Sequence, residues 1–404
     1  MCDEINDDAY IEWEFTLFNN RYIPIKLLGA GSYCGVWFSY DLTNDGFCAL
    51  KIYNRCDYER AHTEIEVFDA LKQLNIKNIV LCDDIFDHKN DDIVDSCKDD
   101  DSNDDSNDDN TKHTNIFRCL TMPLCGYSLD DIIKMFSDTE YDIPIDFINN
   151  VVMKCIDILN ELHKHNYVHA DIKPDNILLK KPSRILVDYM KIINNVRKKF
   201  PKITNKNRDT FIETLRVHIE KFNDENDNNC DSVSDDLYKY IFDGNYDIVL
   251  CDMGTTVPPN DEKLYHKYTI YYRAPETILE LGFDASYDYW SLGCTIYELL
   301  TKKILFDADD NLQLLYAIIS RLGPLPDYMI SSSPMRRNYF CKDHFNNDFF
   351  RLRGYSSIEW SPLFNSLLDM INKFTNPTEL CQFTNVVNIM LNCLQIEYKK
   401  RHLY

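Results

Sequence analysis

The sequence predicts an α+β protein with a β-rich first part and a mainly helical second part. From Tyr22 to Tyr53, runs of β-branched and aromatic residues are broken by glycines, a pattern typical of strands joined by turns. After Gly126 the apolar residues recur every three or four positions, as they do in amphipathic helices. Hydrophobic residues make up 45% of the 404 residues, which is enough for a large core.

The first part is expected to contain five strands and one helix. Residues 57–75 have helical spacing, with Ile65, Phe68, Leu71 and Leu74 on one stripe. Further strands are expected at residues 79–86 and 116–122. Residues 1–20 are polar and acidic, so we expect a lead-in that precedes a first domain at residues 21–126.

Residues 87–114 are predicted to be an acidic insertion in this first domain. The formal net charge of the chain is −23, and residues 83–110 alone carry thirteen Asp and two Lys. Such a run repels itself and is usually a solvated loop, although a functional acidic arm is the alternative reading. The acidity of the remaining chain disfavours a nucleic-acid partner and favours a basic peptide.

The second part, residues 127–404, is expected to begin with helices and to contain a long spacer. Residues 148–163 form a good amphipathic helix, and a short strand is expected at residues 176–179. About 65 residues, roughly 181–246, then precede the next strand, which is too long for a simple loop. We interpret them as an insertion within this second part, with an amphipathic stretch at residues 209–222. A partner-binding role and a disordered insertion without a role are equally open for it.

Three patterns that the sequence lacks bear on its expected cellular compartment and on a membrane partner. No apolar run approaches the roughly 20 residues that a membrane span needs, and the first residues lack a secretory signal pattern. The fifteen cysteines show no C-x-x-C pair, which is typical of reduced thiols. We therefore expect an intracellular protein, cytoplasmic or nuclear, without a membrane partner.

The segment 169–176, His-Ala-Asp-Ile-Lys-Pro-Asp-Asn, is the strongest chemical signal in the chain. Asp171 can accept the proton of an attacking hydroxyl, Lys173 can neutralise phosphate charge, and Asn176 can hold a Mg²⁺ ion. An Asp in a loop is more often a turn residue than a base. The spacing of all three, followed by Asp252-Met253-Gly254, is what points to phosphoryl transfer.

These motifs, with Ala274-Pro275-Glu276 downstream, resemble those of the eukaryotic serine/threonine protein kinases. The resemblance implies a bilobal protein kinase fold, with a five-stranded small lobe that has one helix and a mainly helical large lobe. It also implies ATP and Mg²⁺ as cofactors and a protein substrate with a Ser or Thr acceptor. Asp171 would then be the catalytic base, Lys173 a phosphate contact, and Asn176 and Asp252 the metal ligands.

The resemblance places the nucleotide site mainly in the first part of the chain. Lys51 would contact the α- and β-phosphates and pair with a Glu of the following helix, for which Glu64 is preferred over Glu66. A solvated helix Glu is the alternative for both and weighs more for Glu66. An ordinary β-hairpin is the alternative reading of the glycine-rich loop, and Cys34 stands where a third glycine is usual. Met122 would guard the back pocket, and backbone groups of Pro123 and Cys125 would read the adenine edge. The remaining expected contacts are the loop residues Leu28, Gly29, Ala30, Gly31, Ser32, Tyr33, Cys34, Gly35 and Val36, together with Ala49 and Leu178.

Three residues that follow Asp252 in the sequence, Thr269, Glu276 and Asp288, are expected to hold the catalytic segment in place. Thr269 would tie the peptide-binding loop to Asp171 and Lys173. Glu276 would form a buried ion pair with Arg401, and Asp288 would anchor the backbone of the catalytic loop.

Arg273 is typical of the group that includes the SR-protein kinases and the cyclin-dependent kinases. Three further features are similar to the SR-protein kinases: the segment 36–41 after the glycine-rich loop, the small residue Ala170 and the spacer. Because many regulated kinases have at position 170 an arginine that grips an activation-segment phosphate, we expect constitutive competence. Phosphorylation of Thr255, Thr256 or Tyr265 would have no such partner.

The resemblance leaves the substrate open. An Arg/Ser-rich substrate would call for an acidic docking groove in residues 323–374, but that region is mixed in charge. A proline-directed Ser/Thr kinase of the same group is the alternative, and a nucleotide-binding pseudokinase scaffold is a second one. A monomer is expected. The charged residues of the region are Arg336, Arg337, Lys342, Arg351 and Arg353 with Asp327, Asp343 and Asp348.

Overall fold

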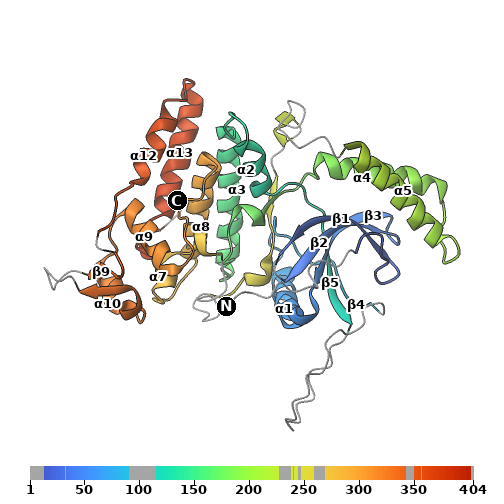
Figure 1. Cartoon of the computed structure of the whole chain (residues 1–404), viewed down its shortest axis with the longest axis horizontal. Helices are drawn as coiled ribbons and strands as arrows, with labels where there is room; N and C mark the ends of the chain where they lie inside the picture. Colours follow the sequence, from blue (N-terminus) through green and yellow to red (C-terminus); the bar gives the residue numbers. More distant parts are fainter. Residues whose placement is uncertain are drawn as a thin grey trace, which may run out of the picture. The chain divides into compact units, whose positions relative to one another are not determined.

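The structure is a computed structural model, and its chain divides into two compact units (Figure 1). It describes residues 13–31, 33–90, 115–226, 238–239, 241–243, 247–258, 269–342, 350–355 and 357–401. The first unit comprises Met1–Lys72, Val80–Gly126 and Pro182–Cys230, and the second comprises Gln73–Ile79, Tyr127–Lys181 and Asp231–Tyr404.

The first unit is built on a five-stranded antiparallel sheet in the order β1-β2-β3-β5-β4. Together with helix α1, this sheet is the predicted content of a kinase small lobe. Strand β4 begins at Asp84, five residues later than predicted, because the apolar residues Val80 and Cys82 are buried outside the sheet ladder. The strands are β1 (Tyr22–Ala30), β2 (Cys34–Asp41), β3 (Gly46–Tyr53), β4 (Asp84–Lys89) and β5 (Ile116–Met122), and α1 is Tyr58–Leu74.

Each face of the sheet carries a cluster of buried apolar residues. Successive side chains of a strand point to opposite faces, so Trp37 and Phe38 of β2 belong to different clusters. Trp37 packs with Tyr22, Leu50 and other residues of one cluster. Phe38 packs on the other face, where the partners come from the spacer.

The spacer forms two helices, α4 (Arg184–Lys199) and α5 (Arg208–Asn226), which cover this second face of the sheet (Figure 1). Sequence alone placed these residues within the large-lobe segment, whereas their helices pack with the small-lobe strands in one compact unit. The physical reason is an apolar stripe on each helix that fits the apolar face of β1 and β2. The buried residues of this cluster are Phe15, Ile23, Ile25, Phe38 and Tyr40 together with Leu186, Tyr189, Ile193, Val196, Phe211, Leu215 and Ile219.

Polar contacts fix the helix pair at its ends. Arg197 of α4 forms an ion pair with Asp45 in the β2–β3 turn at 3.1 Å. The Tyr189 hydroxyl donates a hydrogen bond to Asn223 Oδ1 at 2.7 Å, which joins α4 to α5. Arg208 donates to Asn20 at 3.2 Å. The spacer helices are therefore held by both apolar and polar contacts.

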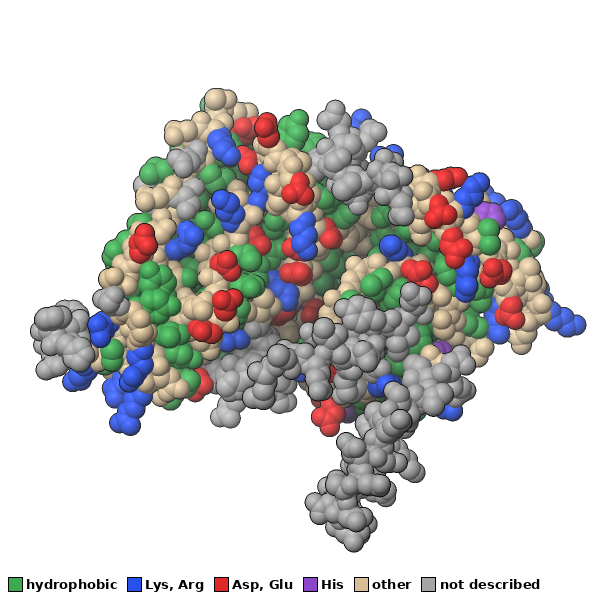
Figure 2. All heavy atoms as spheres, in the orientation of Figure 1, with side chains coloured by type: hydrophobic (Ala, Val, Ile, Leu, Met, Phe, Trp, Pro, Cys, Tyr) green, Lys and Arg blue, Asp and Glu red, His purple; other side chains and the backbone are tan. Residues whose placement is uncertain are grey.

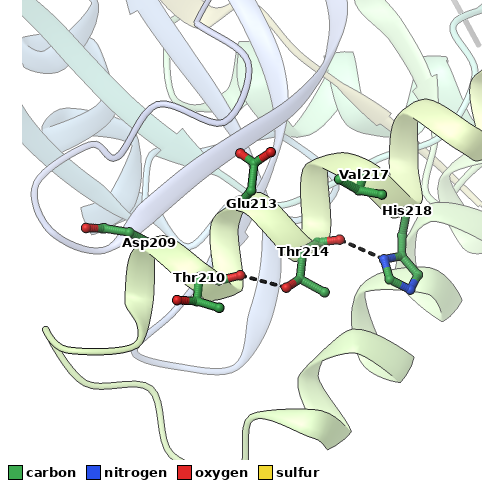
Figure 3. A pocket seen from close by; sticks show the side chains of 6 residues that line it. All are labelled: Asp209, Thr210, Glu213, Thr214, Val217 and His218. Carbon is green, nitrogen blue, oxygen red and sulfur yellow. Dashed lines mark hydrogen bonds between the residues drawn. The ribbon is translucent and has the colours of Figure 1, made fainter.

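The outer surface of α5 carries an open depression of about 530 Å³ (Figure 3). Its hydroxyl and imidazole groups already bond the helix backbone, Thr214 Oγ1 to Thr210 O at 2.7 Å and His218 Nδ1 to Thr214 O at 2.7 Å. Val217 is 53% exposed there, in contrast to the buried Leu215. The helix is thus amphipathic, with its apolar stripe turned to the sheet.

The second unit is mainly helical and surrounds α8 (Ser286–Thr301). Helix α8 packs on α3 (Ile145–Lys164) and α13 (Pro377–Cys393). Gly293 allows this close packing, since a Cβ there would lie 2.8 Å from Leu394 Cγ and 2.9 Å from Cys393 Cβ. The remaining helices are α2 (Leu129–Ser137), α7 (Pro275–Ile278), α9 (Asn311–Leu322), α10 (Asp327–Ser332), α11 (Arg336–Tyr339) and α12 (Leu363–Ile371).

Two short antiparallel strand pairs complete the second unit. Strands β6 (Ile177–Leu179) and β7 (Ile248–Leu250) pair across the spacer, and so bring together the segments that carry Asn176 and Asp252. Strands β8 (Phe340–Lys342) and β9 (Phe350–Leu352) form a hairpin after α11. Among the described helices, none is long and apolar enough to cross a membrane.

Candidate active site

Asp171, Lys173 and Thr269 form a connected polar cluster in the second unit. Lys173 Nζ lies 2.9 Å from Asp171 Oδ2 and donates a hydrogen bond to Thr269 Oγ1 at 2.9 Å. The Thr269 hydroxyl also lies 3.3 Å from Asp171 Oδ1, to which it donates. Thr269 belongs to the activation segment, residues 252–276, which is therefore tied near its end to the loop that carries the predicted base.

Lys173 keeps its positive charge in this cluster. Burial by itself lowers the pKa of its ammonium, but the carboxylate of Asp171 and the more distant Asp175 and Asp252 outweigh burial and raise the pKa overall. A permanent cation beside the predicted base suits charge neutralisation on a transferred phosphoryl group.

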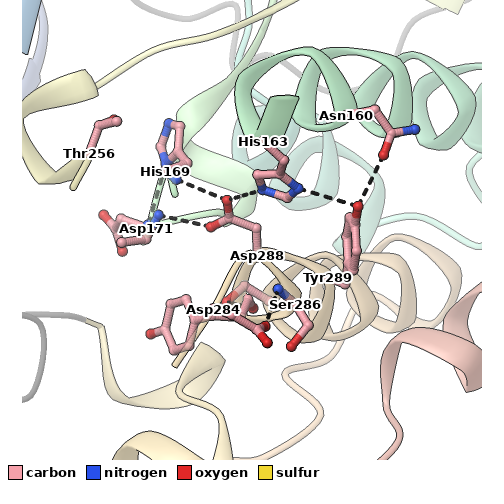
Figure 4. Close-up of polar contacts among 12 residues, drawn as sticks. Asn160, His163, His169, Asp171, Thr256, Asp284, Ser286, Asp288 and Tyr289 are labelled. Atoms are coloured by element: carbon pink, nitrogen blue, oxygen red, sulfur yellow. Dashed lines mark hydrogen bonds and ion pairs between the residues drawn. The ribbon is translucent and has the colours of Figure 1, made fainter. Parts of the chain in front are cut away.

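Asp288 anchors the backbone of the catalytic loop, as predicted (Figure 4). Its fully buried carboxylate accepts hydrogen bonds from the backbone N–H groups of His169 at 2.9 Å and Ala170 at 2.8 Å. His163 Nε2 of α3 lies 2.8 Å from the same carboxylate. The prediction for Asp288 is confirmed, and the contact of His163 adds a third partner.

This anchor holds a strained conformation. Ala170 has φ = 71°, in the left-handed region that non-glycine residues rarely adopt, and Asp252 has φ = 60°. Such residues persist only where their surroundings fix them, at a cost of about 1–3 kcal/mol each. The bond from Ala170 N to Asp288 supplies such a constraint one residue before Asp171.

Sequence reasoning assigned no role to the two histidines that pack around this anchor, His169 and His163. His169 is fully buried, and its Nε2 lies 3.0 Å from the backbone oxygen of Cys251, next to Asp252. His163 also contacts the Tyr289 hydroxyl, at 3.3 Å from Nδ1. The only signal for His163 was its place near the end of the helix that leads into the loop.

Two of the predicted phosphorylation candidates, Thr255 and Thr256, already contact other groups. Thr255 Oγ1 donates to the backbone oxygen of His169 at 3.0 Å, and Thr256 is buried with its Oγ1 3.7 Å from Met253 Sδ. Tyr265, the third predicted phosphorylation candidate, lies outside the described residues.

The predicted ion pair between Glu276 and Arg401 is confirmed. Arg401 Nη1 and Nη2 lie 2.5 Å and 2.7 Å from the two carboxylate oxygens of Glu276, and neither side chain is exposed. The guanidinium carbon also lies 4.8 Å from the ring centroid of Trp290. A bidentate, fully buried pair of this kind links the end of the activation segment to the end of the kinase-like chain.

In the first unit, Lys51 on β3 is held by Glu64 of α1. Lys51 Nζ lies 2.9 Å and 2.8 Å from the two carboxylate oxygens of Glu64, and both residues are buried. Glu66 is exposed and lies near His62 instead. The ammonium is thus oriented by a buried bidentate acceptor, which is the arrangement a phosphate-binding lysine needs.

The glycine-rich loop joins β1 to β2. A Cβ at Gly29 or Gly31 would meet no atom of the described residues within 4 Å, so packing among these residues does not require a glycine at either position. A residue without a Cβ leaves the backbone accessible to a ligand. Tyr33 is exposed, with Arg60 of α1 3.5 Å from its ring centroid. Leu28, Ala30, Cys34, Gly35 and Val36 lie on β1 and β2, and Ser32 lies outside the described residues.

The predicted adenine contacts are divided between the two units. Ala49 of β3 and Met122 at the end of β5 are register partners and are buried in the first unit. Pro123 and Cys125 follow directly on β5, in an extended stretch without helix or strand. Leu178 lies on β6, in the second unit.

The predicted metal ligands offer oxygen atoms of the kind that Mg²⁺ prefers. Asn176 Nδ2 donates to the backbone oxygen and to Oδ2 of Asp171, at 2.8 Å and 3.0 Å, which turns the carboxamide oxygen away from Asp171. The backbone N–H of Cys251, the neighbour of Asp252, donates to Asn176 O at 3.0 Å. The pair of residues therefore fits a hard divalent cation.

Comparisons with known proteins agree with this geometry. The family model described as protein kinase domain matches residues 22–195 and 239–402. The chain is 25% identical over 389 residues to serine/threonine-protein kinase AFC3 of Arabidopsis thaliana, covering 94% of this chain and 79% of the relative. It is 26% identical over 326 residues to dual specificity protein kinase CLK4 of Homo sapiens, covering 79% of this chain and 53% of the relative.

A viral relative is similar to the same extent. A putative serine/threonine-protein kinase of Acanthamoeba polyphaga mimivirus is 23% identical over 445 residues, covering 84% of this chain and 78% of the relative. Members of the protein kinase family use ATP and Mg²⁺ and act on protein substrates. The chain belongs to the protein kinase domain family, and it is a serine/threonine protein kinase of the branch related to the SR-protein kinases.

Proposed function

We propose that this kinase transfers the γ-phosphate of Mg²⁺-ATP to serine or threonine in a basic, Arg/Ser-rich segment, and that it does so without prior phosphorylation of its activation segment. The contact set of Asp171, Lys173 and Thr269 carries the catalytic part of the proposal. Asp171 accepts the proton of the substrate hydroxyl, and Lys173 neutralises charge on the transferred group. When bound, Mg²⁺ supplies further charge neutralisation at the phosphate oxygens, with Asn176 and Asp252 as its protein ligands.

Competence without phosphorylation is supported by the way the activation segment is held. Where many kinases place an arginine to grip a phosphate, this chain has Ala170, whose N–H bonds Asp288. Thr255 already contacts the catalytic loop through its own hydroxyl, and Thr269 contacts Lys173. These bonds fix the described ends of the activation segment without an added charge.

A basic acceptor sequence is supported by an acidic cluster next to the catalytic loop. Burial, and then the nearby Asp130, raise the pKa of Asp175, which directly precedes Asn176. Burial also raises the pKa of Glu298, and Asp130 and Asp175 add to this effect. Lys134 offsets the negative charge of Asp130, with which it forms an ion pair at 2.5 Å. Burial is the larger cause of both shifts, and the negative charges of Asp130 and Asp175 add to it. A cation near Asp130 and Asp175, such as a substrate arginine, would offset their repulsion.

The test is phosphate transfer from Mg²⁺-ATP by protein expressed in bacteria and treated with phosphatase. An Arg/Ser-repeat peptide, a Ser-Pro peptide and the Asp171→Asn protein would run in parallel. We expect transfer to the Arg/Ser peptide by the dephosphorylated enzyme and none by Asp171→Asn.

Other outcomes would change the proposal in specific ways. Transfer only to the Ser-Pro peptide would favour the proline-directed alternative. Activity that appears only after activation-segment phosphorylation would refute constitutive competence. Nucleotide binding without phosphate transfer to either peptide would favour the alternative of a nucleotide-binding pseudokinase scaffold.

A further inference from the structure

The segment from α11 to β9 concentrates positive charge in a strongly acidic protein. We call its five basic residues the basic hairpin: Arg336, Arg337, Lys342, Arg351 and Arg353. In Figure 2, blue Lys and Arg side chains gather at the lower left of the view, over the region where Figure 1 labels α10 and β9. The formal net charge of the whole chain is −23, so this surface opposes the overall sign.

None of these five side chains forms an ion pair with a carboxylate in the described part of the chain; residues 343–349, with Asp343 and Asp348, lie outside it. Several other cations of the second unit are paired, for example Lys154 with Asp247 at 2.6 Å and Lys373 with Asp142 at 2.6 Å. Arg337, Lys342 and Arg353 are exposed to solvent, so among the described residues their charges are accessible to another molecule.

Within the described residues, the contacts of Arg336, Arg351 and Arg353 are with neutral groups. Arg353 Nε donates to the backbone oxygen of Phe340 at 3.1 Å. The guanidinium of Arg336 lies 6.0 Å from the ring centroid of Phe350. Arg351 Nε is buried without a hydrogen-bond partner among the described residues, and its Nη2 lies 4.0 Å from Cys341 Sγ. Arginines positioned by neutral groups remain able to bind carboxylates.

We propose that the basic hairpin is a docking surface for an acidic peptide segment of the protein substrate. The acceptor region and the docking region would then select opposite charges, since Asp175 and Asp130 lie at the catalytic loop. The cations are distributed over α11 and both strands of the hairpin, which fits an extended acidic segment. A long nucleic acid fits less well, because it would continue past the hairpin onto a protein of net charge −23.

This inference depends on the proposed function in one respect, namely that the docked peptide belongs to a substrate of the kinase. An Arg/Ser kinase with an acidic docking groove would bind a basic segment, whereas the basic hairpin would bind an acidic one. The substrate it predicts has a basic acceptor sequence joined to a stretch rich in Asp or Glu.

The test compares one acceptor peptide with two tails. An Arg/Ser acceptor is joined by a Gly/Ser linker of about 10 or about 20 residues to a run of glutamates or, as the matched control, to a run of glutamines. The proteins are the wild type, the Arg337→Glu/Lys342→Glu variant and a charge-matched control, Lys198→Glu/Lys199→Glu on α4. Arg337, Lys342, Lys198 and Lys199 are all exposed, and both double variants change the net charge equally.

We expect the glutamate tail to lower KM about tenfold in the wild type and in the α4 control, with kcat unchanged and the effect lost at high salt. In Arg337→Glu/Lys342→Glu the two tails should give the same KM. An equal tail effect in all three proteins, or none in the wild type, would overturn the proposal.

A direct binding measurement separates this inference from the proposed function. Fluorescence anisotropy of a labelled glutamate peptide without an acceptor serine should show binding that Arg337→Glu/Lys342→Glu loses. Such binding with no phosphorylation of the Arg/Ser acceptor would refute the substrate proposal and support the docking surface. If a single-stranded RNA oligonucleotide instead bound at the hairpin and the glutamate peptide did not, the surface would be a nucleic-acid site and the proposal would be wrong.

Discussion

The catalytic loop and the basic hairpin are both charged parts of the second unit, but they treat charge in opposite ways. At the catalytic loop, Lys173 is paired with Asp171 and Asp288 bonds two backbone N–H groups. In the basic hairpin, the described residues offer no carboxylate to any of the five cations.

Charged groups thus have two roles in this unit, to fix the backbone at the catalytic loop and to remain accessible to another molecule in the basic hairpin. A buried carboxylate with several partners fixes one backbone conformation, because breaking the set leaves an uncompensated group in the interior. An exposed cation without a partner adds little to stability and remains available to another molecule. Substitutions at the catalytic loop should therefore damage catalysis and folding, whereas substitutions in the hairpin should affect recognition alone.

The largest expected effect is on catalysis, from Asp171→Asn. Removal of a general base commonly costs 10²–10⁴-fold in rate, and we expect about a 10³-fold loss of kcat. Steady-state phosphate transfer measures kcat, and nucleotide binding followed by fluorescence serves as the control for a folded protein. A variant that keeps more than a tenth of the wild-type kcat would show that Asp171 is not the base.

The largest expected effect on stability is from Glu276→Gln. This change leaves the Arg401 guanidinium buried without its anionic partner, and loss of one member of a buried pair costs about 3–5 kcal/mol. Urea denaturation followed by tryptophan fluorescence measures the free energy of unfolding. The double variant Glu276→Gln/Arg401→Met should be less destabilised than the single one, because no buried charge remains; equal destabilisation would contradict this account.

Asp288→Asn should have an intermediate effect on both properties. It weakens charged hydrogen bonds to His169 and Ala170, which are worth about 1.5–3 kcal/mol each at most, and it releases the left-handed conformation before Asp171. We expect a loss of about 2 kcal/mol in unfolding free energy together with a lower kcat at unchanged KM for ATP. A variant with lowered stability but wild-type kcat would show that the anchor does not position the loop.

The smallest expected effect is on the stability of the basic hairpin. Replacing Arg337 and Lys342 together by alanine removes no ion pair among described residues, so the free energy of unfolding should change by less than about 0.5 kcal/mol. The same urea denaturation measures it. A larger loss would mean that these cations are structural, and the comparison between the two regions would fail.

Much of the fold followed from sequence patterns that have a direct physical meaning. Strand β5 has the bounds that were predicted, and α3 extends the predicted helix by a few residues at its start. The backbone partners of Asp288 and the pairing of Glu276 with Arg401 were expected from the resemblance to the kinase family. The residue roles at the nucleotide site remain predictions.

Other features depended on tertiary contacts that no local pattern reveals. The apolar residues Val80 and Cys82 suggested a strand, but a short apolar run does not distinguish a strand from another buried segment. Ala170 gave no sign of its left-handed conformation, since a small residue is compatible with any loop. An amphipathic stretch at residues 209–222 predicted a helix without showing which surface its apolar side would meet.

The packing of α4 and α5 on β1 and β2 has a consequence for how the chain is made. Strand β5 ends at Met122, but the buried residues of α5 that cover the sheet extend to Ile219, about 100 residues later. At a synthesis rate of about 5–20 residues per second, the ribosome completes α5 roughly 5–20 s after β5, the last strand of this sheet to be synthesised. During that interval Ile23, Phe38 and Tyr40 face solvent or a chaperone, so completion of the first unit must wait until the whole catalytic loop has been translated.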